Sequence, residues 1–221
     1  QITKKVIDQK QKNEADAEKL LSSIEDIVLN KLGIKLPKEK ENTLKNRIFI
    51  SSMSKLSGNR LDPYYYNVSF DDLIESISKG TFAVGKLSSI TKNIDTGKTP
   101  PKSAYLESDD VDILPVIKAG SYSGDFIDID KSDFVKSDFS GNVVFKGDIF
   151  ILGAAHQAEY VGKKVYYLND TPKQKTFFVG ELVRISAETS KCNSSYLFAI
   201  LKTKLYMSLL NREKRGQTSH L

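Results

Sequence analysis

The first 32 residues contain neither proline nor glycine, and their apolar side chains recur at helical spacing. Gly33 can adopt the left-handed conformation that ends a helix, and Pro37 prevents the helix from resuming. The sequence therefore predicts a helix over residues 1–34, about 45–50 Å long at roughly 1.5 Å per residue. The apolar residues that share one stripe of this helix are Leu20, Leu21, Ile24, Ile27, Val28 and Leu32.

The middle of this helix, residues 8–18, is polar apart from Ala15 and Ala17, so it cannot be buried on all sides. A narrow apolar stripe on a long helix is typical of helices that pack lengthwise against another helix. We therefore expect a coiled-coil-type helix whose partner lies outside this sequence. The chain also begins without a start methionine or a helix cap, which predicts a fragment of a longer protein. A second copy of the same helix could take the place of the missing partner.

After Lys86, short β-rich runs alternate with Gly, Asn, Asp and Pro. Residues 194–210 have helical spacing and are expected to form one closing amphipathic helix. The strands predicted with most support are Val111–Ile117, Val143–Phe145, Ile149–Leu152, Val165–Leu168, Phe177–Val179 and Leu182–Ile185. We expect an α+β domain with a mostly antiparallel sheet and flanking helices.

This domain is expected to cover residues 47–221, after a charged, proline-flanked linker at residues 35–46. Near its start, Ile48–Ile50 is a short strand candidate, and Ser69–Ser78 is predicted to be a helix with a serine cap.

The net charge of +5 is unevenly distributed, at +5 for residues 1–60, −6 for residues 61–150 and +6 for residues 151–221. The basic last third suits a polyanionic partner, although ordinary soluble proteins reach the same balance. A single cysteine, Cys192, excludes an internal disulfide and an all-cysteine metal site. No apolar run approaches the roughly 18 residues of a membrane helix, so we expect a cytoplasmic protein without membrane contact.

Two motifs resemble catalytic sites, and each lacks an essential residue. Before Gly97-Lys98-Thr99, Lys92 stands where a phosphate loop has its first glycine, and Pro100 stands where the following helix should begin. In Asp62-Pro63-Tyr64-Tyr65, tyrosine replaces the second proline of an adenine-methylating motif. The chain has only two histidines and no metal-binding spacing of His or Cys. We therefore expect no catalytic residues, no metal and no cofactor.

Taken together, several segments resemble the DNA-specificity subunits of type I restriction–modification systems. In that family a recognition domain opens with a leucine-led segment and a Gly-Lys-Thr-Pro stretch, and continues through a Lys-Gly-Asp-Ile turn, an Ile-Gly-Lys-like turn and a Tyr-Leu-containing helix. The corresponding segments here, with the spacer helix and its exit, are Leu20–Ile34, Arg60–Tyr65, Leu87–Ile90, Gly97–Pro100, Lys146–Ile149, Val161–Lys163, Tyr196–Leu197 and Gly216–Gln217.

The resemblance implies a non-enzymatic, sequence-specific double-stranded DNA-binding module that reads one half of a bipartite target. It also implies methyltransferase subunits as direct partners and a restriction subunit as an indirect one. Only one recognition domain and one long helix are present, where the family has two of each. Two alternatives remain open, a recognition module of a fused restriction–methyltransferase enzyme and a protein-interaction module that does not bind DNA.

Two loops and the C-terminal tail combine base-reading groups, aromatic rings and phosphate-seeking lysines, the mixture that groove recognition requires. One loop follows Gly97 and the other leaves the predicted strand at Gly153 through small residues. The predicted DNA-binding residues are Lys98, Thr99, Lys102, Tyr105, His156, Gln157, Tyr160, Lys163, Lys164, Arg215, Gln217 and His220.

Overall fold

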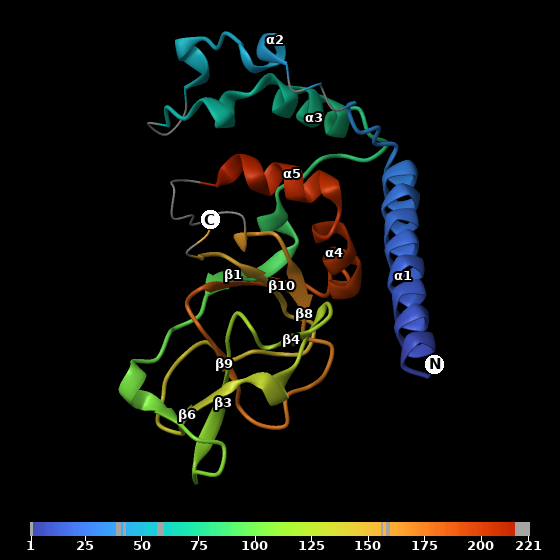
Figure 1. Cartoon of the computed structure of the whole chain (residues 1–221). Helices are drawn as coiled ribbons and strands as arrows, with labels where there is room; N and C mark the ends of the chain where they lie inside the picture. Colours follow the sequence, from blue (N-terminus) through green and yellow to red (C-terminus); the bar gives the residue numbers. More distant parts are fainter. Residues whose placement is uncertain are drawn as a thin grey trace. The chain divides into compact units, whose positions relative to one another are not determined.

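The computed structural model describes residues 2–38, 41, 43–56, 60–155, 157 and 160–214. The chain divides into two compact units (Figure 1). The first comprises Gln1–Val84 with Thr203–Leu205, and the second comprises Gly85–Lys202 with Tyr206–Leu221. The sequence analysis instead begins the recognition domain at residue 47, and that boundary stays a prediction.

The first unit begins with the predicted long helix, α1 (Ile2–Leu32). Gly33 ends it with a φ of +67°, and the amide of Ile34 donates to the carbonyl of Leu29 at 2.9 Å. This is the left-handed helix end expected from the glycine. A Cβ at residue 33 would lie 2.4 Å from the Thr81 hydroxyl oxygen, so the position also lacks room for a side chain.

Two further helices follow in this unit, α2 (Leu44–Arg47) and α3 (Val68–Ser78). Asn67, not a serine, caps α3, because its side-chain oxygen accepts a hydrogen bond from the amide of Ser69. The predicted strand at Ile48–Ile50 is wrong, since these residues are irregular and Ile50 is 95% exposed. Without a neighbouring strand, β propensity alone does not form a sheet.

Arg60 and Asp62 form a local corner in the same unit. The Asp62 carboxylate accepts from Arg60 Nε at 2.5 Å and from the Tyr65 amide at 3.0 Å, and the Arg60 guanidinium lies 4.1 Å from the centre of the Tyr65 ring. These contacts begin the 3₁₀ turn Pro63–Tyr66. The segment that resembles a methylation motif therefore has a structural role here.

The second unit contains two sheets. One has the strand order β1-β10-β7-β8-β5-β4 and the other β2-β6-β3-β9. The pairs β5·β8 and β3·β9 are parallel and the other pairs are antiparallel, which confirms the predicted α+β fold with a mostly antiparallel sheet. The bounds are β1 (Thr91–Thr96), β2 (Tyr105–Leu106), β3 (Ile113–Ile117), β4 (Tyr122–Ser123), β5 (Phe126–Ile127), β6 (Asp133–Lys136), β7 (Ile149–Leu152), β8 (Val165–Tyr167), β9 (Phe177–Phe178) and β10 (Leu182–Ala187).

Residues on β7 alternate between two cores. Phe150 packs with Phe177 and Phe178 of the second sheet, while Ile149 and Ile151 pack with the helices α4 (Ser194–Leu201) and α5 (Lys204–Glu213). Within this unit, Figure 1 shows the helices, the first sheet and the second sheet in succession. Burial on both faces explains why this strand is a continuous apolar run.

The closing segment is two helices and not the single helix predicted, because the first helix ends at Leu201 and the second begins at Lys204. The buried Thr203 lies between them. No glycine or proline marks this break, so the local sequence does not signal it.

Candidate nucleic-acid interface

The first predicted loop leaves β1 at Gly97, where two backbones approach closely. A Cβ on Gly97 would lie 2.0 Å from the carbonyl oxygen of Phe178, and the Lys98 amide donates to that oxygen at 3.0 Å. The glycine is therefore required for packing against the end of β9, not for wrapping a phosphate. Lys98 and Thr99 follow it with exposed side chains.

Thr99 and Glu181 connect this loop to the turn between β9 and β10. The Gly180 amide donates to Thr99 Oγ1 at 2.9 Å, and Thr99 Oγ1 donates to Glu181 Oε2 at 2.9 Å. This chain of donors and acceptors fixes the orientation of both side chains.

The backbone of Glu181 also contacts the second predicted loop, which leaves β7 at Gly153. Its carbonyl accepts from the amides of Gly153 at 2.7 Å and Ala154 at 3.2 Å. The loop returns at Gly162, whose amide donates to the Leu152 carbonyl at 2.8 Å and whose φ is +68°. Both predicted loops are thus tied to one residue, Glu181.

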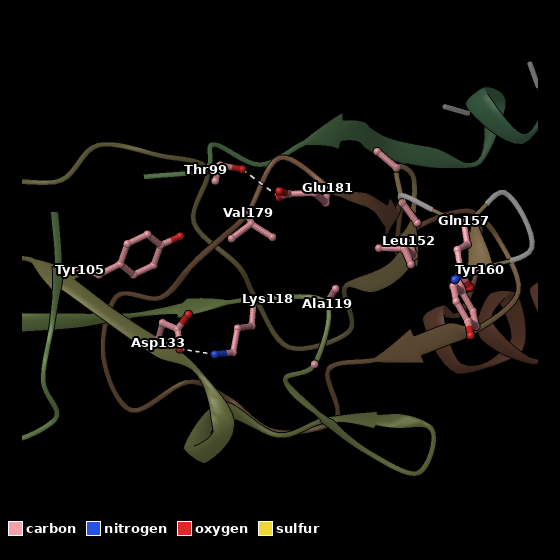
Figure 2. A pocket seen from close by; sticks show the side chains of 13 residues that line it. Thr99, Tyr105, Lys118, Ala119, Asp133, Leu152, Gln157, Tyr160, Val179 and Glu181 are labelled. Atoms are coloured by element: carbon pink, nitrogen blue, oxygen red, sulfur yellow. Dashed lines mark hydrogen bonds and ion pairs between the residues drawn. The ribbon is translucent and has the colours of Figure 1, made fainter. Parts of the chain in front are cut away.

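A cleft of about 750 Å³ lies between the two loops (Figure 2). The strands β1, β3, β7 and β9 each end beside it, because the residues that follow them line its walls. Figure 2 shows Tyr105 toward one end of the cleft and Gln157 with Tyr160 toward the other. The lining residues are Thr99, Tyr105, Lys118, Ala119, Gly120, Asp133, Leu152, Ala154, Ala155, Gln157, Tyr160, Val179 and Glu181.

The charges in the cleft are partly neutralised. Lys118 Nζ forms an ion pair with the Asp133 carboxylate, and no basic side chain of the described residues forms one with Glu181. Burial, followed by the charges of Asp133 and Glu181, raises the pKa of Tyr105 above its ordinary value of 10.0. The Tyr105 hydroxyl therefore keeps its proton at neutral pH and can donate a hydrogen bond.

The predicted lysines do not line the cleft. Lys98 Nζ lies 5.3 Å from the centre of the Phe139 ring, Lys163 Nζ lies 5.7 Å from that of Tyr160, and Lys164 Nζ lies 5.5 Å from that of Tyr122. Lys102 is exposed on the 3₁₀ turn Lys102–Ala104. These cations are accessible to solvent, as phosphate-binding lysines must be.

Lys163 also lies close enough to the end of α5 to affect Lys214. Burial, followed by the charge of Lys163, lowers the pKa of Lys214 below its ordinary value of 10.5. Two neighbouring cations on a surface repel each other, and a polyanion bound there relieves the repulsion. The predicted residues His156, Arg215, Gln217 and His220 lie outside the described residues.

Of the predicted residues, Thr99, Tyr105, Gln157 and Tyr160 share the cleft, whereas the lysines do not line it. Lys118, Asp133 and Glu181 also line the cleft and were not predicted from the sequence. Lys118 follows β3, Asp133 begins β6 and Glu181 directly precedes β10, and the only local signal is a charged residue beside an apolar run.

Within the described ranges, no three or more His, Cys, Asp or Glu side chains cluster in a way that could bind a metal ion. Among the helices of those same ranges, none is both long and apolar enough to span a bilayer. Cys192 is half-buried, and burial raises the pKa of its thiol.

Comparison with known proteins returned no matching family model and no matching curated protein. Among solved structures, the chain is similar to the HsdS subunit of Thermoanaerobacter tengcongensis, with 15% identity over 64% of this chain and a TM-score of 0.44. It is also similar to a chain from a structural study of complex assembly and conformational transition of the type I R-M system, with 16% identity over 68% of this chain and a TM-score of 0.45. The match spans 33% and 35% of those chains.

Proposed function

We propose that this chain is a DNA-recognition module of a type I restriction–modification system, reading one half of a bipartite double-stranded target. The observation that carries the proposal is the meeting of two loops, residues 97–105 and 153–164, around one cleft tied together by Glu181. These loops are the segments whose composition suits groove recognition. Their family motifs, Gly97–Pro100 and Val161–Lys163, supply the link to restriction–modification.

The polar side chains at the cleft and the basic side chains around it would make different contacts with DNA. Gln157, Tyr105 and Thr99 offer donors and acceptors at the cleft and would contact base edges. Lys98, Lys102, Lys163 and Lys164, and the basic tail Arg215, Gln217 and His220, would contact phosphate oxygens. Contacts with bases determine sequence preference, and contacts with phosphate supply affinity that depends on salt.

Catalysis belongs to partner subunits in this proposal, and the module itself binds methyltransferase subunits in the cytoplasm. A protein partner would cover large apolar side chains that the first unit leaves exposed. These residues are Leu44, Ile48, Ile50, Met53, Leu61 and Tyr64. The restriction subunit would join through the methyltransferase.

A fused enzyme remains the alternative, because the same recognition module can be the carboxyl-terminal part of a polypeptide with its own catalytic domains. The coding sequence upstream of Gln1 distinguishes the two. A methyltransferase domain in the same reading frame identifies a fused enzyme, and a separate upstream gene identifies a specificity subunit.

The test is selection from a pool of duplexes with a randomised segment, using the whole chain at fixed salt. We expect enrichment of one short motif. In competition titrations on that motif, Gln157→Ala should lose about 1–3 kcal/mol against the selected site with little change for scrambled DNA. Lys163→Ala should weaken both alike.

Failure to enrich any sequence contradicts the proposed function and favours a protein-interaction module. Enrichment with no effect of either substitution keeps the function but moves the reading surface away from residues 156–164.

A further inference from the structure

Glu181 combines features that no other acidic residue of the cleft shares. Its side chain is exposed, it lines the cleft, and it forms no ion pair with the described residues. Asp133, the other carboxylate there, is paired with Lys118. A carboxylate without a paired cation raises the free energy of a bound polyanion unless it makes a specific contact with that polyanion.

The position of Glu181 is fixed from two sides. Thr99 Oγ1 donates to its Oε2 at 2.9 Å, and its backbone carbonyl accepts from Gly153 and Ala154. Oε2 thus accepts a hydrogen bond from Thr99, and Oε1 of the same carboxylate, whose orientation this bond fixes, can accept another. A specificity contact requires this kind of fixed orientation.

We propose that Glu181 determines specificity by accepting a hydrogen bond from the exocyclic amino group of a cytosine in the major groove. This inference rests on the proposed DNA-binding function. Cytosine presents its N4 amino donor to the major groove, whereas adenine presents the N7 acceptor beside its N6 donor. A carboxylate accepts and does not donate, so it matches cytosine and is repelled by the N7 acceptor of adenine.

Thr99 acts on this contact through Glu181 and is a positioning residue. Its hydroxyl receives one hydrogen bond from Gly180 and gives one to Glu181. Serine can make both bonds and valine can make neither, although valine is similar in shape. Thr99→Ser should therefore preserve the base preference that Thr99→Val loses.

The experiment repeats the randomised-duplex selection with the whole chain carrying Glu181→Gln, and with Glu188→Gln as the matched control. Glu188 undergoes the same chemical change but lines a different cavity, beside Lys92 and Lys146. We expect Glu181→Gln to lower cytosine preference at one position of the motif by about 5-fold to 150-fold, with a shift toward adenine, which suits a glutamine amide. The other positions should not change, and Glu188→Gln should select the wild-type motif.

A second probe removes the amino group from the DNA instead. Replacing the selected cytosine by 2-pyrimidinone, which lacks N4, should weaken wild-type binding more than it weakens Glu181→Gln binding, because a neutral amide oxygen accepts a weaker hydrogen bond than a carboxylate does. Because backbone atoms of Glu181 hold the second loop, the variant should fold, and its thermal midpoint verifies this.

The outcomes separate the two proposals. If the wild-type chain enriches no sequence, the DNA-binding function itself is wrong. If the wild type enriches a motif and Glu181→Gln enriches the same motif with the same preferences, the role of Glu181 is wrong and the function stands. A loss confined to an adenine position also overturns the assignment to cytosine.

Discussion

Arg184 on β10 binds Asp95 on β1 through two hydrogen bonds, from Nε to Oδ1 at 2.9 Å and from Nη2 to Oδ2 at 2.6 Å. The guanidinium is nearly inaccessible to solvent and also donates from Nη1 to the carbonyl of Val143. Asp148, from the Lys-Gly-Asp-Ile turn, lies 3.6 Å from the same Nη1. One arginine therefore connects β1, whose end carries the Gly97 loop, with that turn.

Removing this arginine should destabilise the second unit strongly. Arg184→Met leaves the buried Asp148 and the half-buried Asp95 without their cation, which costs about 3–5 kcal/mol of the free energy of unfolding. Denaturant titration measures the loss. Lys173→Met, which removes an exposed cation, should change the free energy by less than about 0.5 kcal/mol. Equal small effects for both variants would show that the ion pair is not important for stability.

The ionisation of Asp148 should make the free energy of unfolding depend on pH. Burial raises its pKa above the ordinary 3.8, although Ser186 and the Phe145 amide donate to it and Arg184 is near. Between 3.8 and the raised value, the folded protein binds the Asp148 proton more tightly than the unfolded chain does. The stability contributed by this group is therefore present below that interval and is lost as pH rises through it.

Asp148→Asn lacks this titration. The free energy of unfolding of the wild type minus that of the variant should fall as the pH rises from the ordinary pKa of 3.8 through the raised pKa of Asp148, and then remain constant. Denaturant titrations of both proteins across that range give the difference. A difference that grows with pH would mean that Arg184, not burial, dominates the pKa of Asp148.

Lys98 should contact DNA phosphate and not a bound nucleotide. Lys98→Ala should weaken duplex binding and reduce the slope of log K against log salt by about 0.9, the contribution of one phosphate contact. Lys173→Ala is the matched control, because Lys173 lines a cavity with Asp128, Asp130 and Asp170 that does not suit a polyanion. Unchanged DNA binding with a lost affinity for ATP would instead indicate a phosphate loop.

The exposed side chains of Ile24 and Ile27 on α1 should drive self-association when no other partner is present. Ile24 and Ile27 are 40% and 55% exposed, and a helix with a polar middle gains little stability alone. Light scattering should therefore show a dimer that dissociates on dilution. Ile27→Glu should give a monomer, whereas Asn30→Glu, which adds the same charge away from the stripe, should not. A wild-type monomer at all concentrations, with α1 folded, contradicts the prediction.

The sequence predicted best the strand that is buried on both of its faces. Ile149–Leu152 matches β7 in both bounds, because a run buried on both faces is apolar throughout. β1 was missed because Thr91–Thr96 is mostly polar, and its strand conformation depends on pairing with β10. Val143–Phe145 was predicted as a strand and is not one, although the Val144 amide donates to the Thr176 carbonyl.

The candidate site was predicted only in part, because local composition identifies loop residues but not the tertiary contacts between loops. Loop composition identified Thr99, Tyr105, Gln157 and Tyr160, which share the cleft. Glu181 was missed because its role depends on which strand ends meet in space, and no local pattern encodes that. The placement of charged residues at the cleft is therefore determined by tertiary structure.

The central claim is that this chain chooses a DNA sequence for modification by its partners. Methylome sequencing of the source organism with and without the gene tests it most directly, and the strain complemented with Glu181→Gln extends the test. The account predicts that methylation disappears from one bipartite motif when the gene is deleted and returns when it is restored. Identical methylomes with and without the gene would contradict the account.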